Sequence, residues 1–227
     1  MSRNTTTSTT ISMPAGYLAI AASIAALLLL AILHVLSPEF DPSWRMVSEY
    51  TNGEYGWVLS LMFAAWAISS WVLAFAIRSH VGTRASKIGS FFLIAAGIGE
   101  AMASVFDINH PLHGLAGMIG IGSLPIAAML ISVSLGRTQA WAAAKKSLLS
   151  TANLTWISVV LLIVSFIIMI VTYTQAGGDM NTTEVPTSLP TGVIALVGWT
   201  NRFLIVAYCA WVITVAWQAL RVREQKS

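Results

Sequence analysis

One short stretch of the chain gathers three side chains that bind metal ions in many proteins. Asp107, His110 and His113 lie within the stretch Asp-Ile-Asn-His-Pro-Leu-His. Carboxylate and neutral imidazole are ligands for zinc and similar borderline cations. The spacing matches no established zinc signature such as HExxH, so two interpretations stay open. Either the three side chains hold a metal ion, or Asp107 and His110 cap helix ends and His113 donates to a neighbouring carbonyl. Pro111 predicts a helix that starts after His110 and places His113 one turn inside it.

A second acid, Glu100, precedes Asp107 by seven residues inside an apolar segment. Two helical turns would put both carboxyl groups on one helix face, about 10 Å apart along the axis. A carboxyl at such a depth is either protonated or paired within the protein. It is therefore a candidate for ligand binding or for a proton relay with Asp107. The alternative is a protonated group that hydrogen-bonds a neighbouring helix.

Arg202 opens the last apolar segment, on the same side of the chain's segments as most of the acids. We expect it to pair with an acid such as Glu49 or Asp107, or to hold an anionic headgroup. Arg45 and Glu49 are spaced as an i,i+4 ion pair. In an enzyme, Glu49 would be the general base for a metal-bound water and Arg202 would hold a phosphate. Ser48 would have an orienting role in the same site.

Six apolar segments must position these residues. The chain is 56% hydrophobic and 9% charged, whereas soluble domains carry roughly 25% charge. Each segment has the length that a helix needs to cross a bilayer, and only helices or closed barrels satisfy the backbone there. We predict an all-α, six-helix membrane domain over residues 14–221, with a disordered tail at 1–13 and a second tail at 222–227. The predicted spans are Ala15–Leu36, Gly56–Ile77, Ile88–Phe106, His113–Leu135, Leu154–Tyr173 and Val193–Leu220.

Charged residues sort to opposite sides of these spans. Ten of the twelve Lys and Arg residues fall in one set of connections and tails, and seven of the nine acids fall in the other set. The positive-inside bias predicts that the basic side, and with it both termini, lies on the cytoplasmic side of a cell membrane. Because topology explains the basic residues, the net charge of +3 does not indicate nucleic-acid binding.

Two outer connections have recognisable local signals. Asp41 followed by Pro42 predicts the start of a short interfacial helix, and Asn52–Gly53 predicts its end. The connection between the fifth and sixth spans is rich in Gly, Thr and Pro, which predicts a flexible outer loop.

The order of several short motifs resembles a known family. Pro38-Glu-Phe-Asp41 and Ser48-Glu49 follow the first span, Val105-Phe-Asp107 and His113-Gly114 flank the third connection, and Gly198 to Arg202 opens the last span. This pattern resembles the domain of unknown function 998 family of bacterial and archaeal membrane proteins. The resemblance implies a six-helix bundle and no activity, and it makes Ser48, Glu49, Asp107, His113 and Arg202 the candidates for a shared site. Members carry a second histidine four residues after the His-Gly motif, where this chain has Gly117.

Three classes of function remain. The first is a binding protein whose outer cluster, Glu49, Asp107, His113 and Arg202, recognises a lipid headgroup, a partner membrane subunit or a second copy of the chain. The second is a metal-dependent lipid hydrolase with zinc, and the third is a proton-coupled transporter using Glu100 and Asp107. Cys209 is the only cysteine, which excludes disulfides within the chain. Haem is disfavoured because only His34 and His113 would lie at matching depth.

Overall fold

The computed structural model describes residues 13–179 and 187–224. Residues 1–12 of the predicted tail at 1–13, residues 180–186 of the last connection and residues 225–227 of the predicted tail at 222–227 lie outside these ranges. Within the described ranges the protein is all-helical and contains no strand. The long helices are α1 (Met13–Leu36), α2 (Gly56–Ile77), α3 (Arg84–Val105), α4 (His113–Leu135), α5 (Lys145–Gln175) and α6 (Val197–Glu224). Each is long and apolar enough to cross a membrane, which confirms the predicted fold class.

Helix ends differ from the predicted spans where polar residues continue a helix. Helix α3 begins at Arg84 because Thr83 caps it: the Ser86 amide donates to Thr83 Oγ1 (3.1 Å). Helix α5 begins at Lys145 rather than at Leu154, so its first turns are polar. Hydropathy locates only the apolar part of a helix. The predicted spans therefore leave out the polar first turns of α3 and α5. Three short 3-10 helices, η1 (Val47–Asn52), η2 (Arg78–His80) and η3 (Gln139–Ala144), lie in the connections.

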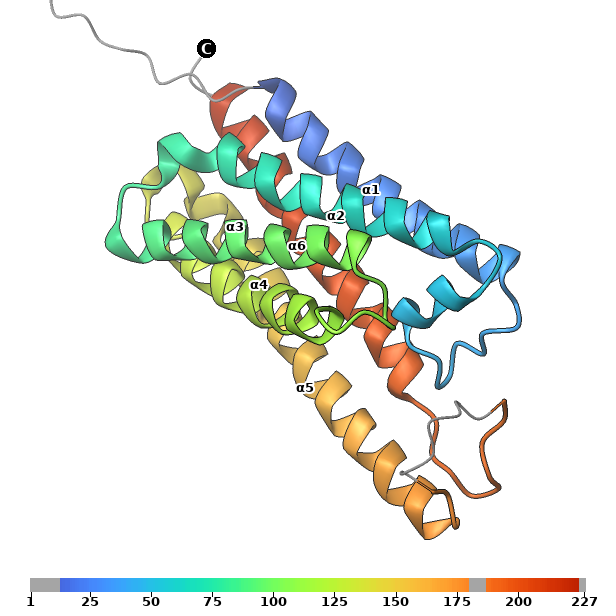
Figure 1. Cartoon of the computed structure of the whole chain (residues 1–227). Coiled ribbons are helices and arrows are strands. Elements are labelled where there is room, and N and C mark those ends of the chain that lie inside the picture. The colour runs from blue at the N-terminus through green and yellow to red at the C-terminus, as the bar shows by residue number, and fades with distance from the viewer. Residues whose placement is uncertain (1–12, 180–186, 225–227) are drawn as a thin grey trace, which may run out of the picture.

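Consecutive helices pack as neighbours, and α6 closes the ring against α1 and also contacts α2 (Figure 1). Helix α6 is the most buried of the six helices, whereas α5 is mostly exposed at the outside of the bundle. The start of α1 and the end of α6 lie at one end of the bundle. The opposite end carries the α1–α2 and α3–α4 connections, and we call it the distal end.

Helices α3 and α4 approach each other through glycine. A Cβ added at Gly99 would lie 2.7 Å from both the Ala116 carbonyl oxygen and the Gly120 Cα, and nearer still to the Gly120 amide. Backbone atoms cannot move aside as a flexible side chain can, so only glycine permits this crossing. The close approach fixes α3, and with it Glu100, against α4.

The side of the membrane that the distal end faces remains a prediction that cysteine labelling can check. Cys209 is buried, so added cysteines will be labelled against a low background. Glu39 lies in the α1–α2 connection and Arg137 in the α4–α5 connection, and both are exposed. With intact cells and a membrane-impermeant maleimide, we expect labelling of Glu39→Cys, and labelling of Arg137→Cys only after permeabilisation. The reverse pattern would invert the predicted topology.

Candidate functional site

Two pockets of contrasting lining lie next to each other at the distal end. The polar pocket has a volume of about 310 Å³, and the side chains that line it include Ser48, Thr51, Glu54, Ser60, Asp107 and His113. The apolar pocket has a volume of about 250 Å³ and lies deeper, between α2, α3, α4 and α6. Its lining includes Phe63, Trp66, Glu100, Gly117, Asn201 and Leu204. Four residues line both pockets: Ser48, Ala103, Ile108 and His113. The two pockets therefore lie side by side, with these four residues bordering both.

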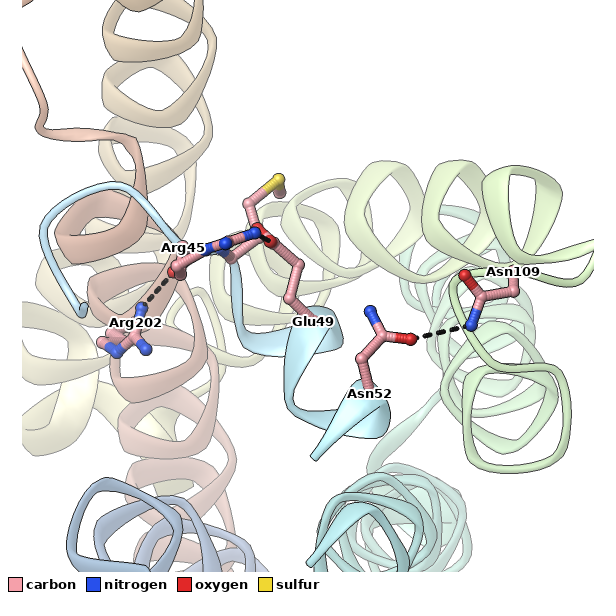
Figure 2. A network of polar contacts seen from close by, with 6 residues as sticks. Arg45, Glu49, Asn52, Asn109 and Arg202 are labelled. Carbon is pink, nitrogen blue, oxygen red and sulfur yellow. Dashed lines mark hydrogen bonds and ion pairs between the residues drawn. The ribbon is translucent and has the colours of Figure 1, made fainter. Parts of the chain in front are cut away.

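The 3-10 helix η1 contributes to both pockets and is fixed at two points. The Val47 amide donates to Asn201 Oδ1 on α6 (2.9 Å). At its other end, Asn109 Nδ2 donates to Asn52 Oδ1 (2.9 Å), which joins η1 to the α3–α4 turn (Figure 2). These bonds hold Ser48 where it borders both pockets.

Arg202 anchors the same connection to α6, and its partners differ from the predicted ones. Arg202 is 5% exposed, and its Nη1 donates to the carbonyl oxygens of Arg45 (2.7 Å) and Gly198 (3.0 Å). Nη2 donates to the Tyr50 hydroxyl (2.9 Å). The predicted pairing of Arg202 with Glu49 or Asp107 is wrong: in the described part of the chain, the ion pair that forms joins Arg45 and Glu49 (Figure 2). Carbonyl oxygens supply the negative potential instead.

His34 completes this network as a neutral ring. Its Nδ1 lies 2.7 Å from the Leu30 carbonyl, which only accepts, so Nδ1 carries the proton. Its Nε2 is then free to accept from Arg202 Nε–H (2.6 Å). A second proton on His34 would place two donors against each other. The bond from Arg202 therefore fixes the tautomer of His34. Both ring nitrogens of His34 are used in hydrogen bonds within the protein.

The interfacial helix begins later than predicted. Asp41 Oδ1 accepts from the Ser43 amide (2.8 Å), which makes a tight turn and lowers the pKa of the Asp41 carboxyl. The helix η1 starts only at Val47, where Glu49 Oε1 accepts from the Met46 amide (2.7 Å). The other oxygen of Glu49 accepts from Arg45 (2.7 Å), as the i,i+4 spacing predicted. Both Glu49 oxygens thus have local partners, and neither pocket includes Glu49 in its lining.

The Asp107, His110 and His113 stretch forms a hydrogen-bonded turn. The Asn109 amide donates to Asp107 Oδ1 (2.9 Å), and the Leu112 amide donates to His110 Nδ1 (3.2 Å). Helix α4 begins at His113 itself, so this residue is not one turn inside the helix as predicted. His113 Nδ1 donates to the Phe106 carbonyl (2.8 Å) and so keeps its ring beside both pockets. Within residues 13–179 and 187–224, no three His, Cys, Asp or Glu side chains group as a metal site. The zinc interpretation stays a prediction from sequence.

Glu100 lies at the inner wall of the apolar pocket and is 3% exposed. Ser70 Oγ on α2 donates to Glu100 Oε2 (2.8 Å). The second oxygen, Oε1, has no hydrogen-bond partner among the described residues. Glu100 therefore brings a buried oxygen without a hydrogen-bond partner to the lining of the apolar pocket.

A family model with the description "Protein of unknown function (DUF998)" matches residues 20–218. The chain belongs to this family. The match spans all six helices of this DUF998 protein, and it confirms the resemblance on which Ser48, Glu49, Asp107, His113 and Arg202 were singled out. No curated protein and no solved structure matches the chain. The function of this DUF998 protein must therefore be argued from its own residues.

Three of those five residues, Ser48, Asp107 and His113, line the polar pocket. Arg202 and Glu49 hold the connection instead. Sequence reasoning missed Ser70, Asn201 and the aromatic pair Phe63 and Trp66. A polar residue within an apolar span was the available signal for Ser70 and Asn201.

Proposed function

We propose that this DUF998 protein binds an amphipathic molecule of the membrane. Its polar part would occupy the polar pocket and its apolar part would occupy the apolar pocket. The observation that carries the proposal is that a polar and an apolar pocket lie side by side and share Ser48, Ala103, Ile108 and His113 in their linings. Small-molecule sites are typically apolar cavities with a few placed polar groups.

The charges of the lining favour a particular headgroup. Glu54 and Asp107 line the polar pocket, and among the described residues no Lys or Arg lines either pocket. Hydroxyl groups and amines complement such a lining, whereas a free phosphate would lack a cationic partner. The earlier expectation that Arg202 holds a phosphate gains no support, because the guanidinium is engaged by protein acceptors.

The two alternative functions, a metal-dependent hydrolase and a proton-coupled transporter, have less structural support. A metal-dependent hydrolase needs Glu49 as a base, and the local partners of Glu49 disfavour that role. A proton relay needs transfer between Asp107 at the outer pocket and Glu100 at the inner one, and His113 lies between them with one ring nitrogen engaged. Both alternatives stay predictions.

A variant that fills the apolar pocket tests the proposal. Gly117 lines this pocket, and a Cβ added there meets no atom within 4 Å. We therefore expect Gly117→Leu to fold normally and to occupy the space of the ligand. Native mass spectrometry of protein purified in mild detergent would measure the bound lipid. The wild type should retain a bound amphiphile and Gly117→Leu should lose it.

Gly122→Leu is the matched control. Gly122 lies on the same helix and is equally open, but it lines neither pocket. This variant should retain the amphiphile as the wild type does. Equal retention by all three proteins would show that the bound molecule lies elsewhere, and absence of a bound molecule from all three would contradict the proposal.

A further inference from the structure

The unpartnered oxygen of Glu100 requires an explanation. A buried acceptor that has lost water and gained no donor costs free energy, and most such groups in proteins are satisfied. Glu100 is 3% exposed, lines the apolar pocket, and uses only Oε2 in its bond to Ser70. Helix α3 has no room to move closer to α4 and find a partner there, because Gly99 already lies against the backbone of Ala116 and Gly120. A donor from outside the chain would complete this group.

Two aromatic side chains line the same pocket as this carboxyl group. Phe63 and Trp66 line the same pocket from α2, with nearly parallel rings whose centroids are 6.3 Å apart. Trp66 precedes Ser70 by four residues, so its ring lies on the helix face that holds Glu100. Aromatic faces attract organic cations, most strongly where water is excluded. The pocket thus combines a carboxyl group with two aromatic rings in an apolar setting.

We propose that the apolar pocket binds a small amphipathic amine, whose ammonium group donates to Glu100 Oε1 and lies against Phe63 and Trp66. This inference rests on the proposed function in taking the apolar pocket as a ligand site, and it differs in placing a polar group, the ammonium, at Glu100 within that pocket. The alkyl part of the amine would lie along the wall formed by Gly114, Gly117 and Gly120. A carboxylate and an ammonium together are neutral, so their pairing offsets much of the cost of burying each charge.

Other ligands fit the pocket less well. A hydrated metal cation needs several oxygen ligands, and among the described residues Glu100 is the one acid that lines the apolar pocket. An anion would face Glu100 here and Glu54 and Asp107 in the neighbouring pocket. A neutral alcohol can donate one hydrogen bond to Glu100 but gains neither ion pairing nor the attraction of the rings. The comparison of an amine with an alcohol therefore isolates the proposed interaction.

Calorimetric titration of the full chain in nanodiscs, with hexylamine and hexan-1-ol as probes, tests the inference. Empty nanodiscs supply the correction for partitioning into lipid. We expect hexylamine to bind the wild type about 10-fold more tightly than hexan-1-ol, the effect of one charge-assisted hydrogen bond. Glu100→Gln keeps the shape and an acceptor for Ser70 but removes the charge, so it should abolish the preference. Glu39→Gln removes an exposed acid that lines neither pocket and should leave the preference unchanged.

A second variant guards against a folding defect in Glu100→Gln. Phe63→Leu removes one aromatic face and leaves the carboxyl group intact. The affinity for hexylamine should fall by about threefold and the affinity for hexan-1-ol should stay unchanged, as expected for the loss of a cation–π contact. An equal effect on both probes would overturn the cation–π part of the inference.

The outcomes separate this inference from the proposed function. If both probes bind equally, and Gly117→Leu blocks both, the pocket binds amphiphiles and the role of Glu100 is overturned. If neither probe binds, the amine inference fails. The proposed function fails with it only if lipid retention is also the same in Gly117→Leu and the wild type.

Discussion

Replacement of Arg202 by methionine is expected to lower the free energy of unfolding by about 3 kcal/mol. Methionine fills similar space but leaves the His34 ring nitrogen, the Tyr50 hydroxyl and two close carbonyl oxygens without their donor. For a chain of this size, such a loss lowers the unfolding temperature by about 10 °C. The α1–α2 connection should loosen first, because Arg202 holds it to α6.

Cys209 provides the measurement. It is the only cysteine of the chain and is fully buried on α6, so a thiol-reactive fluorophore reports unfolding as the sample is heated. Arg45→Met is the matched control, since it also removes an arginine from this network, one whose side chain forms an ion pair with Glu49. This one ion pair should contribute less to stability than the four shortest hydrogen bonds of Arg202, so Arg45→Met should give the smaller shift. Equal shifts in the two variants would contradict the anchoring role of Arg202.

Two glycines that face each other across α3 and α4 should respond to alanine in opposite ways. A methyl group at Gly99 meets the backbone of Ala116 and Gly120, so Gly99→Ala should cost about 2 kcal/mol. At Gly120 the nearest atom to an added Cβ is 3.6 Å away, which is ordinary contact. Because alanine is the better helix former, Gly120→Ala should be neutral or stabilising by up to about 1 kcal/mol.

The same thiol assay measures both alanine variants, and the Gly99→Ala, Gly120→Ala double variant adds a check. If Gly99 lies against the backbone of Gly120, a second methyl group at position 120 cannot relieve the collision. The double variant should then be at least as unstable as Gly99→Ala alone. Similar unfolding temperatures for the two single variants would show that the helices can separate at little cost.

The six helices were predictable because the bilayer imposes a length and a composition on each of them. The interior of the α1–α2 connection was not, since Asp41 can either cap a helix or bond its own turn, and these uses look identical in sequence. The partners of Arg202 were missed for a related reason. Carbonyl oxygens belong to every residue, so the sequence carries no sign of which ones an arginine will reach.

The candidate site was predictable in part. Ser48, Asp107 and His113 were singled out from short motifs, and Glu100 from its depth in an apolar segment; all four line the pockets. Phe63 and Trp66 look like ordinary apolar residues of a span. Their relation to Glu100 depends on the packing of α2 against α3, which hydropathy does not encode.

The anchor built by Arg202 also makes part of the protein tolerant to mutation. Its Nη1 donates to main-chain carbonyls of Pro42, Arg45 and Gly198, so side chains at positions 42 and 45 can drift in evolution without weakening these bonds. Position 198 is the exception, because a Cβ there would collide with the Pro42 and Arg45 carbonyls. The connection beside the pockets can therefore diversify its surface, and with it ligand preference, while Gly198 and Arg202 preserve its path.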